Sequence, residues 1–440
     1  MPHVRRALAM LFSLLLLGQL GSLTIHREVS ATSAQPFSLE GRGIWVHPSH
    51  FSPDPELGPS EIRDTFALYK SLNINFILFL VKDPRSWVYY NSEINPVHPN
   101  YRWDPLNVSI REAHALGLEI HAWFCVFPEG ISEMQDHGLL HERPDLAMVD
   151  IDGNRVPWAC PAKEEVRDYE MSLILEVATR YDVDGIHLDY IRYPNSKVCY
   201  CDHCRSEFKK KHGFDPLDKP EDPLWISWKC SQVSRFVNET YTRIKRIRPE
   251  LKLSAAVFRN PQGAVTSVHQ DWRSWIVGGY IDFVAPMAYI ESLQDFQESV
   301  ENILSSVNWR VPVYVGIGLH KLPDAEALLD QVYVTRVWGA QGQVLFCCHH
   351  LKEEFTEALK NGPYSDSASP PHRDYEDEKE SLVQGQARYE ATLLTAERLE
   401  KTLKEMDRTL IITRIWAVAA TLTAAACFLW LVLERRRRSP

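Results

Sequence analysis

The chain lacks two features that would point to a nucleic acid or a nucleotide. It has no excess of basic residues, because 48 Lys and Arg stand against 58 Asp and Glu and the formal net charge is −10. Proteins that bind nucleic acids usually carry a basic surface, so we exclude that class. No glycine-rich phosphate loop follows the first predicted strand, at 43–46, which argues against a nucleotide-binding sheet.

The N-terminal segment has the pattern of an export signal. Arg5 and Arg6 precede an apolar run at 7–20, and small and polar residues follow as far as Ala34. This order of charged, apolar and small residues predicts a signal peptide over 1–34. An uncleaved N-terminal anchor is the alternative.

A second apolar segment lies near the C-terminus. Residues 415–433 contain no charged residue and are long enough to cross a bilayer. A block of arginines follows at 435–438, and such a block marks the cytoplasmic side of a span. We therefore expect a transmembrane helix over 411–433, a basic cytoplasmic tail over 434–440, and a membrane location with the preceding domain outside the cytoplasm.

Short apolar runs alternate with helical patterns over 39–361. The runs are rich in Ile, Val, Leu and Phe, as strands buried on both faces are. Strands that alternate with helices in this way predict an α/β fold, a (β/α)8 TIM barrel, with a doubly wound open sheet as the alternative. The predicted strands cover 43–46, 74–81, 118–124, 183–188, 251–257, 281–286, 311–317 and 343–347.

The segment after the predicted barrel changes character twice. Residues 362–380 are polar and contain several prolines, so we expect a linker. Apolar residues then repeat every seven positions over 381–410, which predicts a short heptad stalk helix. The stalk would either form a homodimer or stand as a single amphipathic helix. The repeating residues are Tyr389, Ala396, Leu403 and Leu410.

The stretch 184–194 places charged residues near the C-terminal end of an apolar strand. An unpaired carboxylate in a core is costly, whereas the C-terminal rim of a (β/α)8 barrel holds catalytic groups. We therefore predict that Asp189 is catalytic, with an ion pair to Arg192 or Arg42 as the alternative. His187 lies two residues earlier and points to the same side of the strand.

Several motifs occur in order along the predicted barrel. They are Arg-Gly-Ile-Trp-Val at 42–46, Tyr-Asn-Ser at 90–92, the run at 112–124, Trp-Ala-Cys-Pro at 158–161, Val-Arg-Asp-Tyr at 166–169, the run at 184–194, Gln-Asp-Trp at 270–272 and Ala-Pro-Met-Ala-Tyr at 285–289. Together they resemble the glycosyl-hydrolase-like 10 family, over roughly residues 39–351. The resemblance implies a (β/α)8 barrel that hydrolyses glycosidic bonds outside the cytoplasm, in some relatives those of peptidoglycan glycan strands.

The chain departs from the family pattern beside Asp189. A second acid often follows the first in the family, where this chain has Tyr190, and Cys160 stands where a small polar residue is common. A chitinase-like pattern would place a Glu at the position of Ile191. Asp189 therefore has no acidic partner within its own motif.

A second carboxyl group must come from another loop, because glycoside hydrolysis normally uses two. They lie about 5–5.5 Å apart in retaining enzymes and about 6.5–9.5 Å apart in inverting ones. Asp83, Glu129, Asp271 and Glu291 all follow predicted strands. We favour Glu129 and Asp271 as catalytic residues, since each lies beside aromatic or turn residues. A solvated loop acid is the alternative for each.

Other side chains at the predicted rim suit a sugar. Indole rings stack on sugar faces, and His and Arg donate hydrogen bonds to hydroxyl groups. For each histidine, a hydrogen-bonded core position is the alternative. The predicted substrate-binding residues are Arg42, Trp45, Lys82, His121, Trp123, His187, Arg192 and Tyr289.

Three of the nine cysteines lie close together as Cys199, Cys201 and Cys204. This Cys-x-Cys-x-x-Cys spacing is awkward for disulfides and natural for a tetrahedral metal site. Cys160, Cys230 and His203 are candidates for the fourth ligand.

The cysteine pattern resembles the zinc cluster of the family 42 β-galactosidases, in which an upstream Cys before a proline joins a Cys-x-Cys-x-x-Cys loop after strand four. The resemblance implies that Cys160 is the fourth ligand. Four thiolates close the coordination shell, so the zinc would be structural. Disulfides, which suit an exported protein, and free thiols are the alternatives.

These observations together predict a membrane-anchored, extracytoplasmic glycoside hydrolase. Its substrate would be a polysaccharide, with peptidoglycan glycan strands as one candidate. The alternatives are a carbohydrate-binding barrel without activity and a surface adhesion or scaffold protein.

Overall fold

The computed structural model describes residues 38–384, 386–387 and 401. The predicted signal peptide, transmembrane helix and basic tail lie outside these residues, as does most of the predicted stalk at 381–410. Among the helices of the described part, none combines the length and the apolar character that a bilayer span requires.

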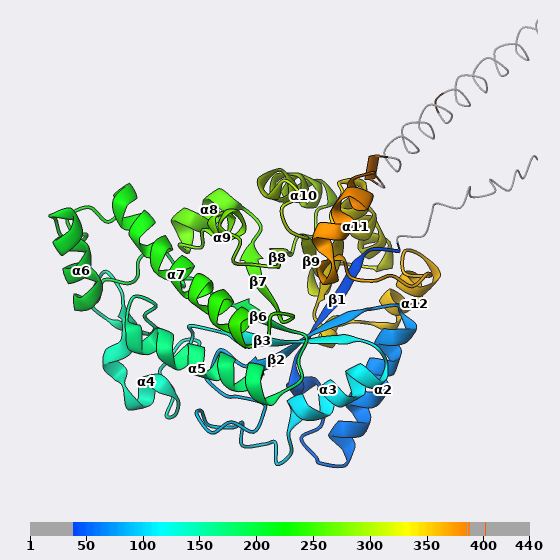
Figure 1. The fold of residues 1–440 in the computed structure, drawn as a ribbon, viewed down its shortest axis with the longest axis horizontal. Helices are drawn as coiled ribbons and strands as arrows, with labels where there is room; N and C mark the ends of the chain where they lie inside the picture. Colours follow the sequence, from blue (N-terminus) through cyan, green and yellow to red (C-terminus); the bar gives the residue numbers. More distant parts are fainter. Residues whose placement is uncertain (1–37, 385, 388–400, 402–440) are drawn as a thin grey trace, which may run out of the picture. The chain divides into compact units, whose positions relative to one another are not determined.

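Eight parallel strands close into a barrel, in the order β1-β10-β9-β8-β7-β6-β3-β2 (Figure 1). Every strand is almost wholly buried, which explains why the strands read as continuous apolar runs. The predicted (β/α)8 barrel is confirmed. The strands are β1 (Gly41–Val46), β2 (Phe76–Lys82), β3 (Glu119–Cys125), β6 (Gly185–Asp189), β7 (Lys252–Phe258), β8 (Phe283–Ala288), β9 (Tyr314–Gly318) and β10 (Gly342–Phe346).

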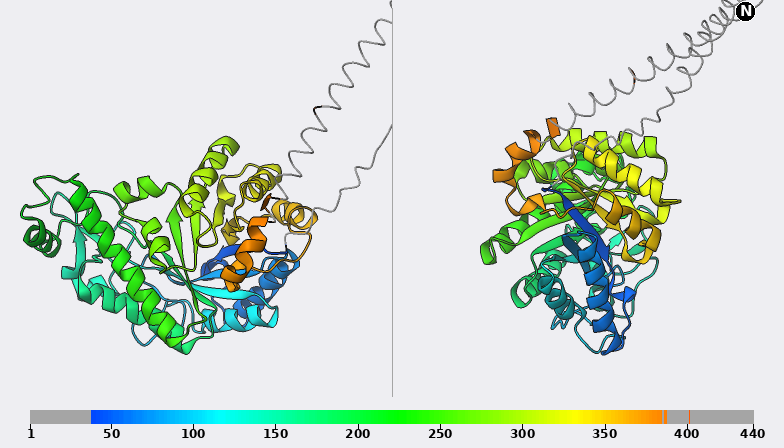
Figure 2. Two further views of the ribbon diagram at one scale, coloured as in Figure 1. Left: turned by 45° about the horizontal axis from the view of Figure 1, so that its top comes forward. Right: turned by 90° about the vertical axis from the view of Figure 1, so that its right-hand side faces the viewer.

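Helices surround the barrel, and the long α7 runs along its outside in green in Figure 2. Short polar side chains cap several of them; Asp104, Asp222 and Ser292 each accept a hydrogen bond from a backbone N–H in the first turn. The helices are α2 (Leu57–Ser71), α3 (Pro105–Ala115), α4 (Leu139–Glu142), α5 (Glu164–Arg180), α6 (Asp202–His212), α7 (Pro223–Ile247), α8 (Pro261–Ser267), α9 (Trp272–Gly278), α10 (Leu293–Val307), α11 (Ala325–Val337) and α12 (Glu353–Asn361).

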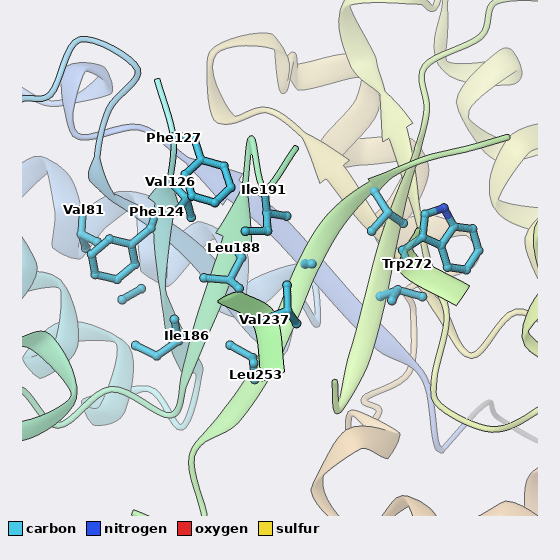
Figure 3. Packing of buried hydrophobic residues seen from close by; sticks show 14 of the residues in the cluster. Val81, Phe124, Val126, Phe127, Ile186, Leu188, Ile191, Val237, Leu253 and Trp272 are labelled. Carbon is cyan, nitrogen blue, oxygen red and sulfur yellow. The ribbon is translucent and has the colours of Figure 1, made fainter. Parts of the chain in front are cut away.

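Strand β6 directs alternate side chains to the two faces of the barrel wall. Ile186 and Leu188 pack in the outer layer, near Val237 of α7 (Figure 3). His187 and Asp189 therefore face the barrel interior, as the two-residue period of a strand predicts. We call the C-terminal end of the barrel strands the mouth and the N-terminal end the floor.

A small hairpin interrupts the long loop after β3. Strands β4 (Ala147–Val149) and β5 (Arg155–Ala159) pair antiparallel, and Asp150 closes the turn by accepting hydrogen bonds from the backbone of Asp152 and Asn154. This hairpin was not predicted, since each strand is short and the second contains a proline. It carries the chain from the mouth to Cys160.

The segment 362–380, which we predicted to be a linker, packs in part against the barrel floor. The short helix η5 (Pro371–Arg373) buries His372, whose Nε2 lies 2.7 Å from Oε2 of Glu119. The Tyr314 hydroxyl lies 2.8 Å from Nδ1 of the same ring. The polar composition of residues 362–380 gives no sign of this contact, because the side chains that the contact buries are themselves polar. The segment closes the floor.

Candidate active site

Asp189 ends β6 and lies in the mouth, with 7% of its surface exposed. The backbone N–H of Tyr190 donates to Oδ1 at 2.6 Å, and Trp123 Nε1 donates to Oδ2 at 3.1 Å. Burial raises the pKa of Asp189 to about 6, although these hydrogen bonds and the Arg192 charge act to lower it. A carboxyl group with this pKa can exchange a proton near neutral pH, as acid–base catalysis requires.

A rigid layer of side chains lies below Asp189. Trp45 Nε1 donates to His187 Nε2 at 3.2 Å, and Nδ1 of the same imidazole lies 2.8 Å from the Ser254 hydroxyl. An indole is a donor only, so His187 is the neutral tautomer that carries its proton on Nδ1. Burial lowers the pKa of His187 well below its ordinary value. The Trp45 ring also packs edge-on against Tyr289.

Aromatic rings surround the Arg192 guanidinium at one side of the mouth. Its central carbon lies 4.9 Å from the ring centre of Tyr190, 5.1 Å from Phe258 and 5.2 Å from Trp158. Rings held in this way are suited to stacking on a sugar, while the cation can donate to hydroxyl groups. Trp158 and Phe258 were not predicted to bind substrate; the position of Trp158, two residues before Cys160, was the available signal.

Asp83 is a second carboxyl group at the mouth, directly after β2. It accepts hydrogen bonds from the backbone of Arg85 and Trp87, at 2.9 and 3.0 Å, and from the Tyr89 hydroxyl at 3.2 Å. Burial raises its pKa. The sequence offers Asp83 as one candidate for the second acid but favours Glu129 and Asp271.

The thiol of Cys125 is influenced by the carboxyl groups of both Asp189 and Asp83. It stands beside Asp189 in the register of β3 and β6, and its side chain lies among the interior residues of the barrel. Burial, followed by the charges of Asp189 and Asp83, raises the pKa of the Cys125 thiol. The charges of both carboxyl groups therefore act on the same buried thiol.

Glu129 and Lys82, predicted as catalytic and substrate-binding, are joined in a buried ion-pair network instead. Lys82 Nζ lies 2.8 Å from Glu129 and 2.9 Å from Glu170 of α5, and none of the three side chains is more than 1% exposed. Ser86 and the Leu139 backbone also donate to Glu129. Burial raises the pKa of Glu170 to about 8. These groups are occupied in holding α5 and two loops against the strand ends.

Two further predicted residues make structural contacts. Arg42 points out of the barrel, where its Nε donates to Glu40 at 2.7 Å and its guanidinium lies over Tyr364. Asp271 accepts a hydrogen bond from the Ser274 backbone and caps α9. Strand alternation explains the first case, because Trp45 faces inward and Arg42, three residues earlier, faces outward.

His121 shares the interior face of β3 with Trp123, as predicted, but it lies at the floor. Its Nε2 is 3.3 Å from Glu119, the first residue of the strand, and its ring contacts His372. The structure thus places His121 away from the mouth and brings five of the predicted substrate-binding residues together there: Trp45, Trp123, His187, Arg192 and Tyr289.

The family model for glycosyl hydrolase-like 10 matches residues 40–335. The chain belongs to the glycosyl hydrolase-like 10 family. It is 27% identical over 297 residues to Glycosyl hydrolase DigH of Escherichia coli O6:H1, a match that covers 57% of this chain and 63% of DigH. It is 29% identical over 224 residues to Glycosyl hydrolase YngK of Bacillus subtilis, covering 46% of this chain and 42% of YngK. The match spans less than two thirds of either relative.

A solved structure agrees with this assignment at the level of the fold. The glycoside hydrolase domain of PgaB (BpsB) from Bordetella bronchiseptica superposes with a TM-score of 0.62 at 14% identity. The match covers 73% of this chain and 98% of that domain. This glycosyl hydrolase-like 10 barrel therefore shares its fold with a glycosidase domain.

The four cysteines predicted as metal ligands converge in this family member. The Sγ atoms of Cys160, Cys199, Cys201 and Cys204 lie within 4.8 Å of one another, and all four residues are buried. Each is a free cysteine. Tetrahedral coordination with metal–sulfur bonds of about 2.3 Å would place the sulfurs about 3.8 Å apart, so the donor set and its spacing fit zinc. Cys230 lies outside the group.

The cysteine group joins the loops that build one side of the mouth. Cys160 directly follows β5, whose Trp158 lies over Arg192. The other three cysteines follow β6, and Tyr200 donates to the Val149 backbone at 2.8 Å. The cysteine group therefore adjoins Trp158, which together with Tyr190 and Phe258 forms the aromatic wall around Arg192.

Proposed function

We propose that the protein is a glycoside hydrolase that cleaves O-glycosidic bonds of a polysaccharide. The observation that carries this proposal is Asp189, a carboxyl group with a raised pKa, at the mouth of a closed barrel and beside an aromatic wall. Family membership supports the same chemistry. Peptidoglycan glycan strands are the candidate substrate to test first.

Asp189 is assigned as the general acid. A pKa of about 6 keeps a fraction of its carboxyl groups protonated near neutral pH, so that it can protonate the leaving oxygen. Asp83 is assigned as the base, because three hydrogen-bond donors stabilise its ionised form. In this reaction Asp83 takes a proton from water and the water oxygen bonds to the anomeric carbon, while the bond from that carbon to the glycosidic oxygen breaks and the leaving oxygen takes the proton of Asp189.

The separation of the two acids follows from the strand order. Asp83 follows β2 and Asp189 ends β6, and β3 lies between these strands. Neighbouring strands are about 4.8 Å apart, which puts the two strand ends about 10 Å apart. Side chains that lean toward each other across this span approach the wider separation of about 6.5–9.5 Å that leaves room for water in inverting enzymes.

The Asp83→Asn variant tests this assignment. We expect kcat/KM for glycan hydrolysis to fall about 100-fold, because an amide cannot accept the proton of the attacking water. Asp271→Asn is the matched control, since an asparagine also caps α9, and it should keep wild-type activity. Equal activity of Asp83→Asn and Asp271→Asn would remove Asp83 from the mechanism. The anomer of the first product, followed by NMR, distinguishes inversion from retention.

A carbohydrate-binding barrel without hydrolytic activity is the second candidate. Tyr190 favours it, because it occupies the place where relatives often have an acid beside Asp189. This candidate predicts that the purified protein binds a glycan, releases no reducing ends, and loses no affinity in Asp189→Asn. Release of reducing ends by the wild type and not by Asp189→Asn rejects it.

We propose in addition that the barrel is exported and held at the membrane by residues 411–433. The apolar segment and the arginines that follow it support this topology. Protease added to intact cells should then degrade the barrel and spare an epitope at the extreme C-terminus.

We propose that Cys160, Cys199, Cys201 and Cys204 hold a structural zinc ion. Four buried thiols within reach of one ion support it, and the closed thiolate shell leaves no position for a reacting water. Zinc would join the loops after β5 and β6 and so keep the aromatic wall in place.

Metal analysis of the reduced, purified protein tests the zinc proposal. We expect Cys204→Ser to lose about one zinc ion per chain and to melt at a lower temperature, because ligand loss removes the folding free energy that zinc supplies. Cys230→Ser, a buried cysteine outside the group, is the control and should keep its zinc. Wild-type protein with less than about half a zinc ion per chain, and with disulfides, would contradict the proposal.

A further inference from the structure

A second group of metal-ligating side chains lies at the rim of the mouth. Strands β1 and β10 are neighbours in the barrel, so the turns that follow them meet. Helix η1 (Pro48–His50) follows β1, and η4 (Cys348–His350) follows β10. These turns bring His50, Cys348 and His349 together, although His50 is almost 300 positions from the other two.

The distances within this group match those of a coordination shell. One ligand atom from each of His50, Cys348 and His349 lies within 4.8 Å of the others. The Cys348 sulfur is 3.5 Å from Nδ1 of His349, and the two imidazole rings are 5.0 Å apart. With metal–nitrogen bonds of about 2.0–2.1 Å and metal–sulfur bonds of about 2.3 Å, a tetrahedral ion separates nitrogen from sulfur by about 3.6 Å.

We propose that His50, Cys348 and His349 form a binding site for a zinc-like divalent transition-metal ion at the rim of the mouth. The donor set of two imidazoles and one thiolate is typical of zinc ligation. Cys347, whose sulfur is 3.7 Å from Nδ1 of His349, lies next to this group but is not one of its three ligands. The backbone N–H of His47 donates to the Cys348 sulfur at 3.5 Å and fixes its position.

This site differs from the buried cysteine group in its access to solvent. His50 and His349 are exposed, while Cys348 is buried. Three protein ligands leave a coordination position for water or for a donor atom of a ligand. The rim site is therefore an exchangeable site, whereas the four-cysteine group is a closed one.

The rim site also lies beside the proposed active site. The His47 ring contacts the His349 ring, and its other side packs edge-on against Trp123 at 4.9 Å. Trp123 in turn donates to Asp189. An ion at the rim would stand beside the path by which a glycan enters the mouth, where its open position could bind a sugar hydroxyl or carboxylate.

Zinc binding to the full-length, reduced protein tests the proposal. Equilibrium dialysis with zinc should show one ion per chain that Cys204→Ser retains and His349→Ala loses. Removal of one of three ligands should weaken this binding by at least about 100-fold, the upper end of the losses seen for changes outside the coordination shell. The matched control is His350→Ala, which removes a histidine from the same turn but outside the group, and it should bind zinc as the wild type does.

Cobalt gives a second readout. Cobalt added to Cys204→Ser, and to Cys204→Ser combined with His350→Ala, should give a sulfur-to-cobalt charge-transfer band from the rim, measured as the difference from Cys204→Ser combined with Cys348→Ser so that the three remaining thiols of the buried group cancel. Equal zinc affinity of His349→Ala and His350→Ala would overturn the proposal. A disulfide between Cys347 and Cys348 that survives treatment with a reducing agent would also overturn it. These readouts do not depend on glycan hydrolysis.

Discussion

Replacing Asp189 by Asn is expected to lower kcat/KM for glycan hydrolysis by about 100- to 10,000-fold, the range that a positioned acid contributes. The amide cannot protonate the leaving oxygen. The loss should be much smaller on an aryl glycoside whose leaving group needs no proton. This difference between substrates distinguishes an acid from a residue that merely shapes the mouth, for which both substrates would lose activity equally.

The pH profile provides the second measurement on Asp189. Its pKa is raised from 3.8 to about 6, and a general acid acts only in its protonated form. Wild-type kcat/KM should therefore fall as the pH rises through about 6, and Asp189→Asn should lose this limb. A wild-type profile that rises through pH 6 would make Asp189 the base or the nucleophile.

Stability should also respond to this change. The folded protein holds the Asp189 proton up to about pH 6 and the unfolded chain only to about 3.8, so this residue lowers stability as the pH rises between these values. Asn removes that dependence, although it can accept only one of the two hydrogen bonds from Tyr190 and Trp123. A variant that fails to fold at neutral pH would contradict this expectation.

Replacing Lys82 by Met is expected to lower the free energy of unfolding by about 3–5 kcal/mol, because it leaves the Glu129 carboxylate buried without a cation. Urea unfolding measures the effect. Lys82→Met combined with Glu129→Gln and Glu170→Gln is the matched control, since it removes the uncompensated charge, and it should recover much of the loss.

The same variant tests the sequence-based role of Lys82. A lysine that binds sugar would, on removal, raise KM and leave stability within about 0.5 kcal/mol of the wild type. Removal of a lysine with a structural role lowers the free energy of unfolding instead. Its ion pairs with Glu129 and Glu170 lead us to expect the second result.

The barrel was predictable because its strands are buried on both faces. Each of the eight apolar runs overlaps an observed strand, and helical patterns separate them. The hairpin β4–β5 and the floor contact of His372 were not predictable in the same way. Both depend on pairing between polar or short segments, and periodicity carries no information about such contacts.

The site was predictable where strand alternation decides the direction of a side chain. Asp189, His187, Trp123 and Trp45 all face the interior. Glu129 and Asp83 each follow a strand, and the sequence favours Glu129 because turn residues lie beside it. Only the position of Lys82, which turns toward α5, shows which of the two carboxylates is already paired.

The contact between His372 and Glu119 at the floor shows at which end of the barrel the two ends of the domain lie. The chain enters β1 at the floor, where Leu39 pairs with Ser369, and His372 brings the chain back to that end. Gln386 also lies there, donating to the backbone of Val337, at the end of α11. Both ends of the domain thus leave from the side opposite to Asp189, so a fusion at either end can be added without crossing the route of a long glycan.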